Sequence, residues 1–208
     1  MLKKTLLFAL LGLLFSFSSY AEETKDPYRS TQPYHFKIQK KQYRSSSFFE
    51  IDTEDTYRGN IKKSSFRIRN CYDLSDKDGW CATGIKRFLS VGLFFNWASV
   101  IDIWGVNDEW LGMIEGNILS TSKAKFSIYD REETLIGIAY MDLQGLGVTI
   151  TPPENEAYTL ARLERVFVPD AADYWKVTVY EPEKFDDRLI RIFAAFCVDT
   201  QASFYRDN

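Results

Sequence analysis

Hydrophobic and polar residues mix along most of the chain in short segments that Gly, Asn, Asp or Pro residues separate. WCATGIKRF at 80–88, AKFSIYD at 124–130 and YWKVTVYEP at 174–182 are examples, and each is rich in β-branched or aromatic residues. Similar segments lie at 64–72, 97–106, 110–119, 135–142, 147–153 and 158–169. About ten short strands at close spacing predict a β-sandwich or a β-barrel.

The last segment of the chain has a different pattern. In DDRLIRIFAAFCVDTQASFY, residues 186–205, a hydrophobic run is interrupted only by Arg191, and Asp186 or Asp187 suits a helix N-cap. A helix that is apolar around nearly its whole circumference must be buried on all sides, and about ten apolar residues are too few to cross a membrane.

A sheet that curls around this helix is the simplest way to enclose it. We therefore predict a mainly β fold: a closed antiparallel barrel of about ten to twelve strands around a helix at about 186–204. Leu189, Phe193 and Phe196 are expected in the core.

Two segments in the middle of the chain share one arrangement. Trp104 precedes Gly112 by the same spacing as Tyr129 precedes Gly137, and polar residues lie between them in both cases. We interpret each unit as a β-hairpin in which the aromatic residue ends one strand against the core and the glycine permits a bulge or a close approach. The alternative, a duplicated ligand site, is less consistent with such ordinary turn chemistry. Trp104 and Tyr129 are therefore predicted core residues.

The beginning of the chain is typical of an exported protein. MLKKTLLFALLGLLFSFSSYAEE has two lysines, a short apolar run and a small-x-small site, which predicts a signal peptide at 1–21 with cleavage near Ala21. Residues 22–47 are polar and basic and hold two prolines, so we expect an exposed arm that ends at most in an edge strand. The barrel domain is expected at 48–208, in a periplasmic or secreted protein.

The hydrophobic stretch 88–106 could suggest a membrane-spanning helix. Asn96 and Asp102 interrupt it, and an aspartate is costly in hydrocarbon, so two buried strands with a turn near Asn96 fit better.

Three cysteines, Cys71, Cys81 and Cys197, make a disulfide possible in an exported protein. A regular hairpin that turns at 76–79 would place Cys71 opposite Gly84, so that Cys71 and Cys81 point to opposite faces, whereas a one-residue bulge would change this. The pairing is left open, and Cys197 is expected to be a buried thiol.

Charge is unevenly distributed along the chain. Residues 28–70 hold ten Lys or Arg against four Asp or Glu, whereas residues 71–208 hold 13 against 22. The basic part could face an anionic lipid or a polyanionic partner, while the acidic remainder disfavours nucleic acid. The candidate anion contacts are Lys37, Lys40, Lys41, Lys62, Lys63, Arg67 and Arg69.

No residues combine into a familiar catalytic, metal or cofactor motif. The single histidine, His35, lies in the predicted arm, and a calcium loop around Asp76 would place Leu74 and Ile85 where oxygen ligands are required. Adjacent acids occur in predicted turns or at a helix start, which explains them by exposure or capping: Asp108 with Glu109, Glu132 with Glu133, and Asp186 with Asp187. No catalytic residue, metal ligand or cofactor is predicted.

The predicted barrel and several of its hairpins resemble a known superfamily. YDLSDKDGW, IDIWGVNDEWLGMIEG and FSIYDREETLIGIAYMD are similar to successive hairpins of the tubby C-terminal-like superfamily, in its LURP-one-related and phospholipid scramblase branch. The resemblance covers roughly residues 48–205 and implies a β-barrel threaded by a hydrophobic C-terminal helix. It also implies lipid head groups as ligands, because tubby domains bind phosphoinositides.

Two classes of function are compatible with the sequence. The preferred one is an exported, non-enzymatic binding or structural module that contacts an anionic membrane lipid or a protein partner through its basic N-terminal half. The alternative is a carboxylate-dependent hydrolase that acts on an envelope or extracellular glycan, which requires two carboxyl groups at a suitable separation in a cleft.

Overall fold

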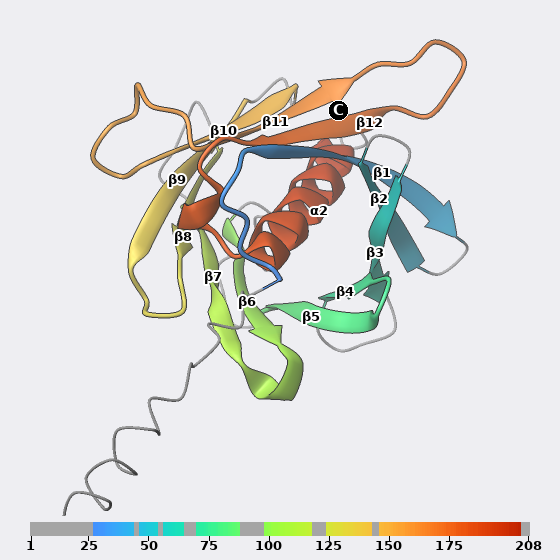
Figure 1. Ribbon diagram of the computed structural model, residues 1–208. Coiled ribbons are helices and arrows are strands. Elements are labelled where there is room, and N and C mark those ends of the chain that lie inside the picture. The colour runs from blue at the N-terminus through green and yellow to red at the C-terminus, as the bar shows by residue number, and fades with distance from the viewer. Residues whose placement is uncertain are drawn as a thin grey trace, which may run out of the picture.

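The chain folds into a closed β-barrel around one C-terminal helix (Figure 1). The computed structural model describes residues 27–43, 46–53, 56–64, 70–87, 98–117, 124–142 and 146–204. Within them, twelve strands follow one another around the barrel in sequence order, and every neighbouring pair is antiparallel. The last strand pairs with the first, so the described sheet has no open edge.

The strands are short. They are β1 (Tyr34–Tyr43), β2 (Ser46–Thr53), β3 (Thr56–Ser64), β4 (Cys71–Asp76), β5 (Gly79–Lys86), β6 (Val100–Gly105), β7 (Trp110–Asn117), β8 (Ala124–Tyr129), β9 (Leu135–Met141), β10 (Gly147–Thr151), β11 (Ala161–Val166) and β12 (Tyr174–Val179). Short 3₁₀ turns lie at η3 (Val106–Asp108) and η4 (Pro182–Lys184), and the helix is α2 (Asp187–Phe204). From residue 79 onward the strands overlap the predicted segments, whereas the segment predicted at 64–72 covers the end of β3, residues 65–69 outside the described part, and the start of β4.

The helix fills the barrel, as its sequence predicts. Leu189, Phe193 and Phe196 are at most 2% exposed, and Phe193 and Phe196 both pack edge-on against Phe126 of β8, with ring centroids 5.7 and 5.6 Å away. Asp186 caps the helix, because its Oδ1 accepts the backbone N–H of Arg188 at 3.0 Å. The inner faces of the strands and this helix therefore form one core.

The two similar sequence units are similar hairpins. Ile103 of β6 pairs with Gly112 of β7, Ile128 of β8 pairs with Gly137 of β9, and a β-bulge follows each isoleucine. The prediction of a repeated fold element with a bulge is confirmed. A bulge increases the local twist of the strands, which helps a sheet to close into a barrel.

The aromatic residues of these units do not lie in the core, so that part of the prediction was wrong. Ile101 and Ile103 point inward and are fully buried, and the alternation of strand side chains therefore turns Trp104 to the outer wall. Its ring packs edge-on against Trp110 at 5.0 Å. Tyr129 is likewise partly exposed, on the opposite face from the buried Ile128.

The prediction of an exposed polar arm at 22–47 was also wrong for the second half of that segment. Tyr34–Tyr43 is β1, which pairs with β12 on one side and β2 on the other and so closes the barrel. Phe36 and Ile38 point into the core, while Lys37 points outward. The barrel therefore begins with Tyr34 rather than near Phe48.

Several predictions concern segments outside the described residues. The signal peptide at 1–21, the first strand and turn expected at 88–97, and Arg67 and Arg69 lie there. The second half of the stretch 88–106 is β6, a strand as expected. In the described ranges, no helix has the length and apolar character needed to span a membrane.

All three cysteines belong to the described residues and are buried, and none forms a disulfide. The bulge considered for the β4–β5 hairpin is present: Cys71 pairs with Ile85 rather than Gly84, and the register shifts between Leu74 and Ser75. The Cys81 thiol donates to the Leu74 carbonyl at 3.6 Å. Burial raises the pKa of Cys197 well above its ordinary value, which disfavours its thiolate form.

Candidate binding site

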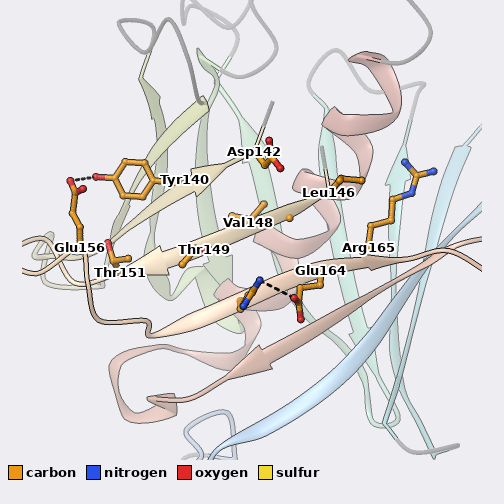
Figure 2. Close-up of a pocket in the computed structure, with 11 residues that line it drawn as sticks. Tyr140, Asp142, Leu146, Val148, Thr149, Thr151, Glu156, Glu164 and Arg165 are labelled. Carbon is orange, nitrogen blue, oxygen red and sulfur yellow. Dashed lines mark hydrogen bonds and ion pairs between the residues drawn. The ribbon is translucent and has the colours of Figure 1, made fainter. Parts of the chain in front are cut away.

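A groove of about 890 Å³ runs along the outer wall of the barrel over β9, β10 and β11 (Figure 2). Its floor is the outer face of β10, where Gly147 has no side chain and Thr149 has a small one. Thr149 pairs with Tyr140 of β9 on one side and with Arg162 of β11 on the other. Two long side chains thus flank a short one, and this difference in length forms the groove.

One end of the groove is aromatic and acidic. Figure 2 shows the Tyr140 phenol directed toward Glu156, to which it donates a hydrogen bond of 2.6 Å. This hydrogen bond is the main reason why the pKa of Tyr140 is raised, to about 12. The phenol therefore remains a protonated donor at neutral pH.

The remaining walls carry paired charges. Arg162 forms an ion pair with Glu164 at 3.1 Å, and Arg165 forms one with Asp173 at 2.6 Å. Asp142 lies near the end of the groove where Leu146 and Arg165 also lie. The groove thus presents both donors and acceptors, together with one phenol ring.

The three groove carboxylates do not have the surroundings of a catalytic acid. Asp142 and Glu156 are exposed, and the Glu164 side chain is 47% exposed and paired with Arg162. A general acid that works at neutral pH is usually held in an apolar enclosure that favours its protonated form. This groove is suited to hold a polar ligand rather than to transfer a proton.

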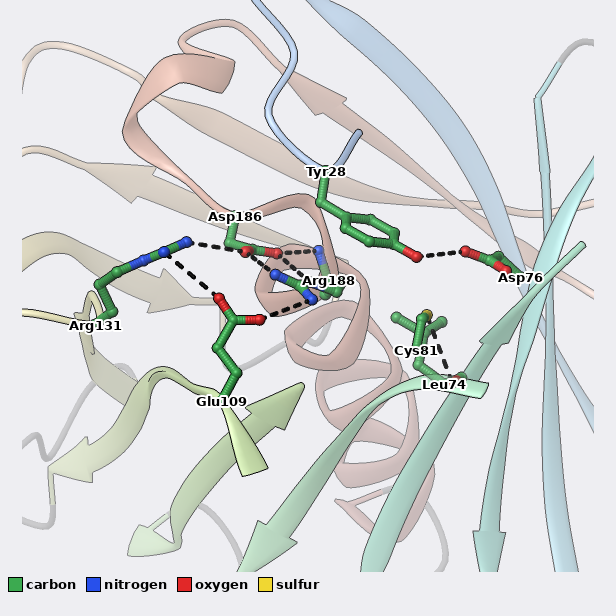
Figure 3. Close-up of polar contacts among 8 residues, drawn as sticks. All are labelled: Tyr28, Leu74, Asp76, Cys81, Glu109, Arg131, Asp186 and Arg188. Carbon is green, nitrogen blue, oxygen red and sulfur yellow. Dashed lines mark hydrogen bonds and ion pairs between the residues drawn. The ribbon is translucent and has the colours of Figure 1, made fainter. Parts of the chain in front are cut away.

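A second polar cluster closes the end of the barrel where α2 begins (Figure 3). The guanidinium of Arg188 donates to both oxygens of Asp186, at 3.0 and 2.7 Å, and to Glu109 at 3.4 Å. Arg131 approaches the same two acids, at 3.5 Å from Glu109 and 3.8 Å from Asp186. Arg188 is only 4% exposed, so these contacts satisfy a buried cation.

Tyr28 covers this cluster from the segment before β1. Its ring lies 4.3 Å from the Arg188 guanidinium, its carbonyl accepts the Asp187 N–H at 2.9 Å, and its phenol donates to Asp76 at 2.8 Å. Burial and the Asp76 hydrogen bond raise the pKa of Tyr28. Every one of these contacts connects parts of the fold, so we assign the cluster a structural role.

His35 is not in an unanchored arm, contrary to the sequence-based expectation. It lies on β1 opposite Thr178 and, with Arg58 and Arg191, lines a smaller pocket of about 280 Å³. In this pocket Arg191 pairs with Asp187, which also accepts the Tyr34 phenol at 2.7 Å. The described residues contain no group of three or more His, Cys, Asp or Glu placed to hold a metal ion.

The predicted anion contacts do not form one basic face. Lys40 and Lys63 point into the barrel, where their ammonium groups lie 2.7 and 2.5 Å from the carboxylate of Asp199 on α2. The phenol of Tyr72 donates to the same carboxylate at 3.0 Å. These two lysines therefore bind the helix to the barrel wall.

The other predicted anion contacts are near acids or outside the described part of the chain. Lys41 forms an ion pair with Glu50. Lys37 lies between Asp52 of β2 and Lys176 of β12, and Lys62 lies opposite Asp73 in the β3–β4 ladder. Arg67 and Arg69 are among the residues that the structure does not describe.

Replacing Asp199 by Asn is expected to destabilise the protein by about 2 kcal/mol at pH 7, because charged hydrogen bonds to two lysines are lost. Burial alone would raise the pKa of Asp199, but the ammonium groups of Lys63 and Lys40 outweigh it and hold this pKa below its ordinary value. The carboxylate thus stabilises the fold above about pH 4, its unfolded pKa, and loses this effect as the pH falls through the lower folded pKa.

Urea unfolding of the wild type and Asp199→Asn across this pH range measures the effect. The difference is expected to shrink as the solution is acidified, and Asp78→Asn, an exposed turn position, is the control with almost no effect. A difference that stays constant down to about pH 2 would contradict the assignment.

The paired acids lie where capping or exposure was expected. Asp108, Glu132 and Glu133 are exposed in turns, and Asp186 caps α2. Glu109 and Asp186 are brought together, but Arg188 and Arg131 lie between and beside them. The arrangement is an ion-pair network rather than a cleft with two accessible carboxylates.

Sequence reasoning missed the groove residues. The signal that could have indicated them is GVTIT at 147–151, where small outward residues alternate with buried Val148 and Ile150. Longer polar residues occur at matching positions of the adjacent strands, Tyr140 and Arg162, but only the register shows that they are neighbours.

Comparison with protein-family models and with curated proteins gives no relative from which a function could be transferred. No protein-family model matches the chain, and no curated protein matches it. The function is therefore inferred from the geometry of the molecule.

Proposed function

We propose that this protein is a non-enzymatic binding module that holds a polar ligand in the outer groove over β9, β10 and β11. The proposal is based on the shape of the groove. Small residues on β10, such as Thr149, lie between long polar residues on both adjacent strands, Tyr140 and Arg162. The helix occupies the barrel interior, which favours a ligand site on the surface of the barrel.

Rigidity of the groove supports this role. Val148 and Ile150, on the inner face of β10, are at most 1% exposed and belong to the core around α2. The outer residues of the same strand are therefore held in place by packing on the other side. A preformed site of this kind binds its ligand with little ordering cost.

We further propose that the chain is exported and belongs to the tubby C-terminal-like superfamily. The lysines, apolar run and small residues at 1–21 support export. A twelve-strand barrel that encloses its C-terminal helix has the architecture that the resemblance implies, which supports the assignment to the superfamily.

An anionic lipid is a weaker candidate for the ligand. It was expected to contact the basic N-terminal half, where Lys40 and Lys63 share Asp199 and Lys41 pairs with Glu50, so that these three lysines keep one net positive charge between them. Anionic vesicles are included in the test below, because binding to them at this face would favour the lipid.

The proposal is tested with a variant that fills the groove. Protein purified from cells expressing the full chain is titrated, by NMR of backbone amides, with three probes: neutral hexasaccharides, the peptide trialanine, and phosphatidylcholine vesicles with or without phosphatidylserine. We expect one probe class to shift the amides of Gly147, Thr149 and Glu164. Thr149→Trp is expected to weaken that binding at least about tenfold, which corresponds to about 1.4 kcal/mol.

Thr178→Trp is the matched control, because Thr178 of β12 is the other cross-strand neighbour of Arg162 but lies outside the groove. It is expected to leave binding within about twofold. Absence of binding by all probes, or binding that Thr149→Trp leaves unchanged, would overturn the proposed function.

A further inference from the structure

We infer that the ligand of the outer groove is a neutral oligosaccharide. This inference rests on the proposed function and names the ligand class of the same site. It follows from three properties of the groove: the hydrogen-bonding capacity of its side chains, the presence of charges of both signs, and the backbone pairing of its floor.

The backbone of β10 cannot recognise a ligand by extending the sheet. Gly147, Thr149 and Ile150 are paired on one or both sides with β9 and β11, which occupy the two edges of the strand. A peptide that binds by strand addition needs an open edge. Recognition in this groove therefore depends on side chains, which disfavours an extended peptide.

The groove carries charges of both signs, from Arg162 and Arg165 and from Asp142, Glu156 and Glu164. Arg162 is paired with Glu164, and Arg165 is paired with Asp173 outside the lining. An anionic ligand would compete with the acids for the two arginines, and a cationic ligand would compete with the arginines for the acids. In either case a protein group with the same sign of charge as the ligand would remain beside it. A ligand without net charge can use the same groups as hydrogen-bond donors and acceptors and leave the pairs intact.

Sugar hydroxyl groups match this mixture of partners. A hydroxyl both donates and accepts, so it can bind a carboxylate oxygen, a guanidinium N–H and the Thr149 hydroxyl. The groove supplies all three kinds of group, with Glu156 and Glu164 as acceptors and Arg162 as a donor. The ring of Tyr140 adds an aromatic surface against which the apolar C–H face of a pyranose can pack.

The site is open on its outer side and follows a strand, so it accepts several linked sugar units rather than one enclosed ring. Figure 2 shows Tyr140 and Glu156 at one end and Leu146 and Arg165 at the other, with Thr149 between them. The exposed positions of Asp142 and Glu156 provide hydrogen bonds without the environment of a general acid. The saccharide is therefore bound without cleavage of its glycosidic bonds.

Titration of the full-chain protein with cellohexaose, maltohexaose and N-acetylchitohexaose tests the inference. At least one is expected to bind, with amide shifts on β9, β10 and β11, and to be recovered uncleaved. Tyr140→Ala is expected to weaken this binding at least about tenfold, whereas Tyr140→Phe keeps the ring and loses less.

Tyr158 provides the matched control. Like Tyr140, it is a tyrosine whose phenol donates to a glutamate, here Glu181, but it is exposed and does not line the groove. Tyr158→Ala is expected to leave saccharide binding within about twofold. Thermal unfolding of each variant separates a loss of fold from a loss of contact.

The outcomes separate an error in the proposed ligand class from an error in the proposed binding site. If trialanine or vesicles bind, no hexasaccharide does, and Thr149→Trp abolishes the binding, the inference is overturned and the proposed function stands. If a hexasaccharide binds but neither Thr149→Trp nor Tyr140→Ala weakens it, both are overturned. Cleavage of the bound saccharide would contradict the inference and favour a hydrolase.

Discussion

Removal of residues 186–208 is expected to abolish folding of the barrel. These residues include α2, whose side chains from Leu189 to Cys197 are buried inside the barrel. Without them, the inner faces of the strands would surround an apolar space that no side chain fills. In the described part of the chain, the helix is the one element that covers these faces, so nothing there could replace it.

Circular dichroism and urea unfolding of the truncated chain measure this effect. A chain that ends at Phe204 retains α2 and is the control, with cooperative unfolding expected. Phe193→Ala in the full chain removes one core side chain instead of the whole helix. It is expected to lower the free energy of unfolding by about 3–5 kcal/mol, as for other buried aromatic rings. A chain without residues 186–208 that unfolds cooperatively would contradict the role of the helix as the core.

Local sequence patterns predicted the helix and most of the strands because their signals lie within a few residues. The unbroken apolar run at 192–198 can only be buried, and Asp186 before it supplies the cap. The hairpins were equally local: polar turn residues separate two strands, and a glycine follows at the position of the bulge.

The orientation of individual side chains was less predictable. Trp104 and Ile103 are both apolar, and alternation requires one to point inward and the other outward, but the sequence does not say which.

Strand β1 was missed because inward Lys40 resembles a solvated residue. Its partner, Asp199, lies at the other end of the chain and becomes visible only when the helix is inside the barrel.

The candidate site depends on register rather than on a motif. Tyr140, Thr149 and Arg162 come from three strands, and their neighbourhood is set by the pairing of β9 with β10 and of β10 with β11. None of the three is unusual in its own strand. A groove made by differences in side-chain length has no sequence signature until the strands are aligned.

Gly112→Ala is expected to destabilise the protein strongly, whereas Gly137→Ala, at the equivalent position of the second hairpin, is expected to have a small effect. Gly112 has φ of 139°, a conformation that side-chain-bearing residues rarely adopt, and a Cβ there would lie 2.2 Å from the Tyr129 carbonyl oxygen. Backbone strain and the clash together cost on the order of 4 kcal/mol.

Gly137 has no positive φ, and the nearest atom to its Cβ would be the Ile150 side chain at 3.1 Å. This neighbour can move by a few tenths of an ångström, so a cost of at most about 1 kcal/mol is expected. Urea unfolding of both variants measures the difference. A larger loss of stability is expected for Gly112→Ala, because the Gly112 backbone lies against the next bulge, at Tyr129. Equal losses in the two variants would contradict this difference between the hairpins.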